Sequence, residues 1–171
     1  MAKNFIYALT CMCFTIVIGG AVYEHMAVVP RWSAAPPASL HMYQGEYGIN
    51  PALFWMVLHP VNLVLFIITL VLHWRTSAKK SILLPFITYV AILVITQVYF
   101  VPELISITTT PFSETVDPSL TSRAKLWEVL SLVRLGVLLV IAMILLLGLT
   151  KQKQVLGAPS KRVLRTGELM N

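Results

Sequence analysis

LWEVLSLVRLGVLLVIAMILLLGLT, residues 126–150, is an apolar stretch with only two charged side chains, Glu128 and Arg134. A helix rises 1.5 Å per residue, so about 20 apolar residues cross the hydrocarbon core of a bilayer. Three further stretches of this length and composition lie at residues 5–23, 51–73 and 82–104. The sequence therefore predicts four transmembrane helices.

The composition of the whole chain supports a membrane protein. Of the 171 residues, 57% are hydrophobic and 12% charged, and the mean hydropathy is +0.79, which is far from the values of a soluble domain. We predict an all-α fold: a polytopic membrane four-helix bundle that forms one domain at residues 1–150. The expected outer loops are residues 24–50 and 105–125, and a basic tail follows at residues 151–171.

The first apolar stretch has an alternative interpretation as a secretory signal. Lys3, the apolar run and Gly19-Gly20-Ala21 resemble such a segment and its cleavage site, and this reading would leave three helices. The Ala-x-Ala pattern of a cleavage site is absent, however, and the run is long enough to span the membrane. We therefore expect the first helix to stay in the protein.

The distribution of Lys and Arg predicts the orientation. Positive residues lie near the N-terminus, in the turn at residues 75–80 and throughout the tail, whereas the opposite side carries only Arg31, Arg123 and Lys125. By the positive-inside rule, both termini face the cytoplasm and the protein lies in the plasma (inner) membrane. The net charge of +6 then indicates contact with the headgroups of the lipid bilayer rather than with nucleic acid.

Polar side chains at membrane depth are the candidates for function, because burying a charge there costs at least ~2.5–3.5 kcal/mol. His59 and Arg134 each lie about nine residues, or roughly 13 Å, from the outer ends of their helices, and we predict them as the catalytic pair. Pro60 and Pro102 each remove a helical hydrogen bond, which predicts a wider space nearby. We expect a ligand pocket open to the outside, lined by Glu24, His25, Trp55, Asn62, Tyr99, Glu103, Trp127 and Glu128.

Structural roles are the alternative for the same residues. Arg134 could be a counter-ion of Glu24, Glu103 or Glu128, and His59 could simply donate a hydrogen bond to a neighbouring helix.

Three stretches carry a resemblance to a known family. They are GGAVYEH at residues 19–25 with VPRW at residues 29–32, FW at residues 54–55 with His59-Pro60, and Arg123 with Trp127-Glu128 and Arg134. Together with four spans, they resemble the anthrone oxygenase-like family of small integral membrane proteins. The resemblance implies a four-helix bundle and a monooxygenase that needs no cofactor and oxidises a polyphenolic anthrone to a quinone with dioxygen.

A mechanism can be written for that chemistry. His59 would remove a proton from a phenol or C–H group, and Arg134 would stabilise the anion. Trp55, Tyr99 and Trp127 would hold a flat aromatic substrate.

Two other functions remain open at this stage. The first is a non-catalytic membrane subunit that binds a hydrophobic small molecule, a partner protein or a second copy of itself as a homo-oligomer. The second is a metal- or haem-binding redox protein, although no Glu-x-x-His pair is present and adjacent Glu24 and His25 diverge by about 100° around a helix. We therefore predict no metal ligands.

Overall fold

The computed structural model describes residues 2–157, with side chains for residues 2–150. Within this part of the chain the secondary structure is helical and contains no strand. Four helical segments are long and apolar enough to cross a membrane: Ala2–Trp32, Ala52–Leu72, Lys79–Thr108 and Pro118–Thr150. The predicted helical class and the four long apolar helices are confirmed. The predicted tail lies outside the described residues from position 158 onward.

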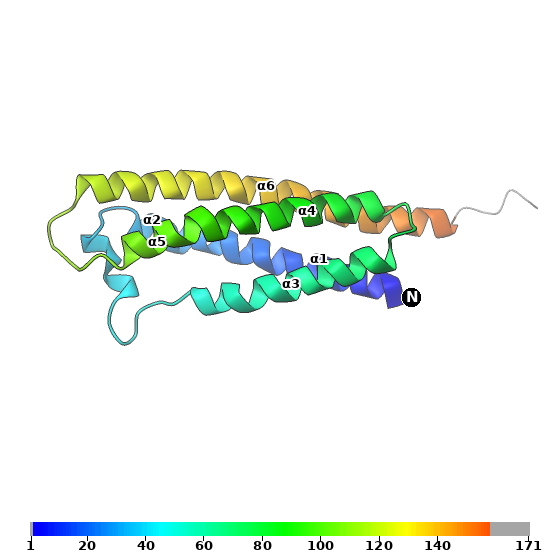
Figure 1. Cartoon of the computed structure of the whole chain (residues 1–171), viewed down its shortest axis with the longest axis horizontal. Coiled ribbons are helices and arrows are strands. Elements are labelled where there is room, and N and C mark those ends of the chain that lie inside the picture. Colours follow the sequence, from blue (N-terminus) through cyan, green and yellow to red (C-terminus); the bar gives the residue numbers. More distant parts are fainter. Residues whose placement is uncertain (1, 158–171) are drawn as a thin grey trace, which may run out of the picture.

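Two of the spans are composite helices (Figure 1). The first consists of α1 (Ala2–Tyr23), the π-helix η1 (Glu24–Val28) and α2 (Val29–Trp32). The third consists of α4 (Lys79–Ile95), the π-helix η3 (Thr96–Phe100) and α5 (Val101–Thr108). The second span is α3 (Ala52–Leu72), the fourth is α6 (Pro118–Gly157), and a short 3-10 helix, η2 (Ala38–Tyr43), lies in the first long loop.

Three of the four helical spans are longer than the apolar stretches from which we predicted them, whereas α3 is slightly shorter. The α6 helix begins at Pro118 rather than at residue 126, because the Asp117 carboxylate accepts hydrogen bonds from the backbone N–H groups of Ser119 (2.8 Å) and Leu120 (3.2 Å). Proline at the first helical position suits such a start. The loop expected at residues 105–125 is therefore reduced to residues 109–117.

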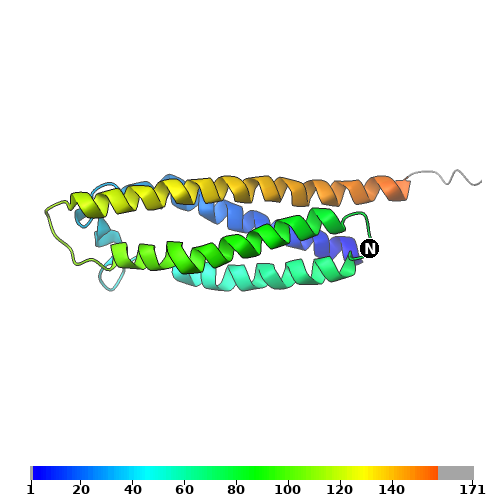
Figure 2. The same cartoon turned by 45° about the horizontal axis from the view of Figure 1, so that its top comes forward.

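The four spans lie side by side along one long axis (Figures 1 and 2). The α1 helix packs against α3 and α6, and α4 packs against the same two helices. One end of the molecule holds the start of α1 and the α3–α4 turn. The other end, which we call the capped end, holds η2 and the loop before α6.

Two separate groups of buried apolar side chains stabilise this arrangement. The main cluster runs through α1, α3, α4 and α6 and includes Phe14, Phe66, Tyr89 and Leu138. The cap cluster lies at the capped end and consists of Val28, Val29, Trp32, Leu40, Phe100, Ile107, Leu120, Ala124 and Trp127. The extra helical turns exist because their apolar sides pack into the cap cluster.

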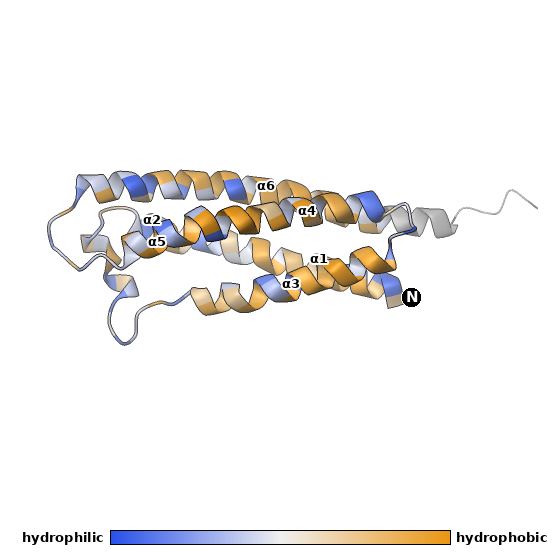
Figure 3. Ribbon diagram, viewed as in Figure 1, coloured by the Kyte–Doolittle hydropathy of each residue, from blue (hydrophilic) through white to orange (hydrophobic). Residues whose placement is uncertain are grey.

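The outside of the helices is apolar along most of their length (Figure 3). Many large side chains there are exposed, among them Leu53, Ile87, Val94, Val133 and Val140. A soluble protein rarely exposes so large an apolar surface, whereas lipid covers it without cost. The chain is an integral membrane protein.

Candidate functional site

A layer of polar side chains separates the two apolar clusters. Along the first span, the main cluster ends near Val22 and the cap cluster begins at Ala27, with Glu24 and His25 between them. Along α6, Ser131 and Arg134 lie between Trp127 of the cap cluster and Leu135 of the main cluster. We use the term polar layer for Glu24, Trp55, His59, Thr96, Ser131 and Arg134.

Arg134 is held in this layer by neutral groups. Its Nη1 donates to Thr96 Oγ1 at 3.0 Å, and its Nη2 donates to Ser131 Oγ at 2.7 Å. The guanidinium carbon lies 4.2 Å from the centre of the Phe100 ring. Among residues 2–150, no carboxylate oxygen lies within 4.0 Å of this guanidinium. The counter-ion interpretation of Arg134 therefore has no ion pair to support it in the described residues.

A chain of contacts links Glu24 to His59. The indole N–H of Trp55 donates to Glu24 Oε1 at 2.9 Å, and the Trp55 ring stacks on His59 with a centroid distance of 5.1 Å. His59 Nδ1 is hydrogen-bonded to the hydroxyl of Tyr89 at 2.7 Å. This chain holds the imidazole in one orientation. The Nε2 atom of His59 makes no hydrogen bond to the described residues.

Close helix approach makes these contacts possible. A Cβ at Gly20 would lie 2.7 Å from the Phe54 ring and 3.4 Å from the Trp55 ring. Glycine at this position of α1 therefore lets the start of α3 bring Trp55 against Glu24.

Asn62 lies about one turn after His59 on α3. Its side chain is fully buried, yet neither its amide oxygen nor its amide nitrogen has a hydrogen-bond partner in the described residues. An unpaired buried amide costs about 1–3 kcal/mol. The core beside His59 therefore retains unused hydrogen-bonding capacity.

The remaining predicted pocket residues make structural contacts at the capped end. Glu103 forms a two-pronged ion pair with Arg123 at 2.8 and 3.0 Å. Glu128 accepts from Lys125 at 3.1 Å and from Ser33 at 2.7 Å. These partners come from helical turns and a loop beyond the predicted spans, so the apolar stretches alone gave no sign that either carboxylate is paired.

Trp127 and His25 also contact backbone carbonyl oxygens of the protein. Trp127 is buried in the cap cluster, where its indole N–H donates to the carbonyl oxygen of Phe100 at 2.9 Å. His25 Nδ1 lies 2.8 Å from the carbonyl oxygen of Ala21, while its Nε2 is buried and has no hydrogen-bond partner among residues 2–150. The structure therefore brings Glu24, Trp55, His59 and Asn62 together and places Glu103, Trp127 and Glu128 elsewhere.

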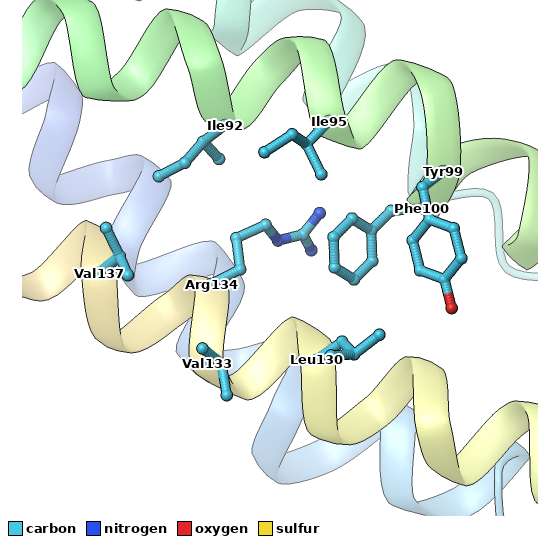
Figure 4. A pocket seen from close by; sticks show the side chains of 8 residues that line it. All are labelled: Ile92, Ile95, Tyr99, Phe100, Leu130, Val133, Arg134 and Val137. Atoms are coloured by element: carbon cyan, nitrogen blue, oxygen red, sulfur yellow. The ribbon is translucent and has the colours of Figure 1, made fainter.

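A groove of about 280 Å³ lies between the third span and α6 (Figure 4). Arg134 is the charged residue of its lining. The walls are otherwise largely apolar and are formed by Ile92, Ile95, Tyr99, Phe100, Leu130, Val133 and Val137. The groove is on the side of the helices, whereas we expected a pocket open at the outer end. The cap cluster occupies that end. His59 and Trp55 do not line this groove.

Two π-helical segments begin at the polar layer, and sequence reasoning missed them. In η1 the N–H of Val29 donates to the carbonyl of Glu24, and in η3 the N–H of Val101 donates to that of Thr96. A proline follows each valine, at positions 30 and 102. The repeated Val-Pro dipeptide was the available signal, because proline cannot continue the α-helical bonding. Such π turns are frequent at functional sites.

Within residues 2–150, no group of three or more His, Cys, Asp or Glu side chains is arranged to hold a metal ion. Comparison of the chain with protein-family models, with curated proteins and with solved structures gives no match.

Proposed function

We propose that this protein binds a hydrophobic phenolic or anthrone-like aromatic at the polar layer and oxidises it with dioxygen, without a cofactor. The resemblance to the anthrone oxygenase-like family suggests the reaction. The polar layer supplies the chemical groups that such a reaction needs. As part of this proposal, both termini face the cytoplasm, the capped end faces outward, and the protein lies in the plasma membrane.

The observation that carries the proposal is that Arg134 makes no direct ion pair with a carboxylate within the described residues. Its charge at membrane depth costs at least ~2.5–3.5 kcal/mol, and the hydroxyls of Thr96 and Ser131 satisfy hydrogen bonds without cancelling the charge. An oxyanion on a bound molecule would cancel it and would form charge-assisted hydrogen bonds. A site that stabilises a phenolate or enolate is therefore the function that suits this residue best.

His59 supplies the base in this mechanism. Tyr89 fixes the imidazole through its hydrogen bond to Nδ1, and Trp55 fixes it by stacking on the ring. The Nε2 atom is then the one that accepts a proton from the substrate. Removal of a proton from the methylene group of an anthrone leaves a carbanion that is delocalised onto the oxygen. The carbanion then reacts with dioxygen. One oxygen atom becomes the new quinone carbonyl, and the other leaves as water with the two hydrogens of the methylene group.

A non-catalytic ligand-binding protein is the second candidate. The observation that favours it is the separation of His59 from the groove that Arg134 lines. In that case Arg134 binds an anion and the Glu24–Trp55–His59–Tyr89 contacts only hold the helices together.

Oxygen consumption distinguishes these two functions. The protein in lipid nanodiscs is mixed with anthrone, and dioxygen uptake and quinone absorbance are followed against empty nanodiscs, which give the rate of spontaneous oxidation. We expect a rate above this background that falls at least tenfold in Arg134→Met and His59→Asn. Arg123→Met, which removes a guanidinium bound to Glu103 at the capped end, is the matched control and should retain most of the rate.

The reaction is refuted if wild-type protein, folded by circular dichroism, adds nothing to the background rate. Wild-type activity that survives unchanged in folded Arg134→Met would instead remove Arg134 from the mechanism.

A further inference from the structure

The groove beside Arg134 combines apolar walls with one cationic group. Ile92 and Ile95 come from α4, Tyr99 and Phe100 from η3, and Leu130, Val133 and Val137 from α6. Figure 4 shows the guanidinium of Arg134 projecting between these walls, next to the face of Phe100. A bound molecule would therefore meet hydrocarbon on most of its surface and a positive charge at one point.

The unused donors of Arg134 define the chemistry of that point. A guanidinium has five N–H donors, and the described residues accept from it at Thr96 and Ser131. With no carboxylate within 4.0 Å in residues 2–150, the charge complements an anionic oxygen. Planar carboxylates and phenolates match the planar donor arrangement of arginine.

The exposure of the lining indicates the route by which a ligand arrives. Val133 is 62% exposed and Ile95 is 53% exposed on the side of the helices, in the surface that lipid covers. The capped end is closed by the buried side chains of the cap cluster, including Trp127 and Phe100. The groove is therefore accessible from the bilayer rather than from water at the capped end.

The volume of the groove limits the size of the amphiphilic molecule that can bind in it. The volume of about 280 Å³ is slightly below the ~300–1,000 Å³ found for small-molecule sites. This volume suits a compact ring system with one charged substituent and is too small for a two-chain phospholipid. Tyr99 and Phe100 provide aromatic contacts for such rings.

The geometry points to a lateral binding site: the groove takes up a compact aromatic anion, a carboxylate or phenolate, directly from the bilayer, and Arg134 binds its charged oxygen. This inference rests on the proposed function in placing the ligand at the polar layer, but it requires no oxidation.

A charge-matched pair of probes tests the inference. Anthracene-9-carboxylate and neutral 9-methylanthracene are titrated against the protein in nanodiscs, with fluorescence anisotropy as the readout and empty nanodiscs as the blank for partition into lipid. We expect saturable binding of the carboxylate at least tenfold tighter than that of the neutral probe. Arg134→Met should remove this preference, because it removes the charge and leaves the apolar walls.

Two valines of α6 provide a test that does not disturb a buried group. Val133 lines the groove, whereas Val140 lies seven residues further along α6 and is 61% exposed, close to the 62% of Val133. Val133→Trp should fill the groove and weaken carboxylate binding at least tenfold, while Val140→Trp should change it less than twofold. This comparison decides the question even if Arg134→Met fails to fold.

The inference is overturned if Val133→Trp binds the carboxylate as wild type does, or if wild-type protein shows no preference for the anion. Its failure is separable from failure of the proposed reaction. Tight carboxylate binding without oxygen uptake removes only the oxygenase reaction. Oxygen uptake that persists in Val133→Trp removes only the lateral groove.

Discussion

The hydrogen bond between Trp55 and Glu24 allows the polar layer to be tested through stability. Trp55→Phe keeps an aromatic ring against His59 but removes the indole N–H that Glu24 accepts at 2.9 Å. A hydrogen bond to a charged group contributes about 1.5–3 kcal/mol, and the half-buried position of Glu24 favours the lower end. We expect a loss of about 1–2 kcal/mol, or a fall of roughly 2–8 °C in Tm.

A second substitution identifies the cause of that loss. In the double variant Trp55→Phe with Glu24→Leu, both polar partners are gone and no unpaired carboxylate remains in the layer. Replacing both members of a buried pair by apolar groups is often nearly neutral. The double variant should therefore be more stable than Trp55→Phe alone, and the two single effects should not add.

Thermal unfolding followed by circular dichroism in one detergent measures these differences. Trp74→Phe is the control, because Trp74 is half-exposed and contacts Lys79 through its ring face, which phenylalanine keeps. It should change Tm by less than Trp55→Phe does. Equal effects of Trp55→Phe and Trp74→Phe, or strictly additive effects in the double variant, would refute a stabilising bond between Trp55 and Glu24.

Two further predictions concern packing and orientation. A Cβ at Gly148 would overlap the Tyr7 hydroxyl, whereas one at Gly19 would meet nothing within 4 Å. Gly148→Val should therefore lower the free energy of unfolding by about 1–3 kcal/mol more than Gly19→Val. Equal Tm values for the two variants would contradict the packing of α1 against α6. For orientation, a cysteine that replaces exposed Ser77, in the α3–α4 turn, should react with an impermeant maleimide only in inside-out vesicles. A cysteine that replaces exposed Ser113 should react only in right-side-out vesicles. The reverse pattern would overturn the proposed orientation. The native thiols, Cys11 and Cys13, are buried and should contribute little background.

The polar layer explains why the two π-helical turns lie where they do. Each begins with a residue of the layer, Glu24 or Thr96, and each ends before a Val-Pro dipeptide. A π turn contains one residue more than an α turn and therefore changes which side chains face inward beyond it. The side chains of the cap cluster, such as Val28 and Phe100, thus follow a different register from those of the main cluster.

Part of the candidate site follows from local helix geometry. Trp55, His59 and Asn62 all face the neighbouring helices, because they are four and three residues apart and such residues share a helix face. The sequence also predicted Glu103 and Glu128 as pocket residues, because both carboxylates lie near the outer ends of apolar stretches. Their ion partners, Arg123 and Lys125, lie in turns of α6 that the hydropathy pattern had assigned to a loop.

The sequence by itself determined the helical class and the number and order of the four membrane spans, because hydropathy and the length needed to cross a bilayer are properties of each segment alone. Only the tertiary structure decided that Arg134 has hydroxyl partners instead of a carboxylate and lines a lateral groove, and that Trp127 lies buried in the cap cluster. Those choices depend on the rotation and axial offset of each helix against its neighbours, which long-range packing and the two π turns set together.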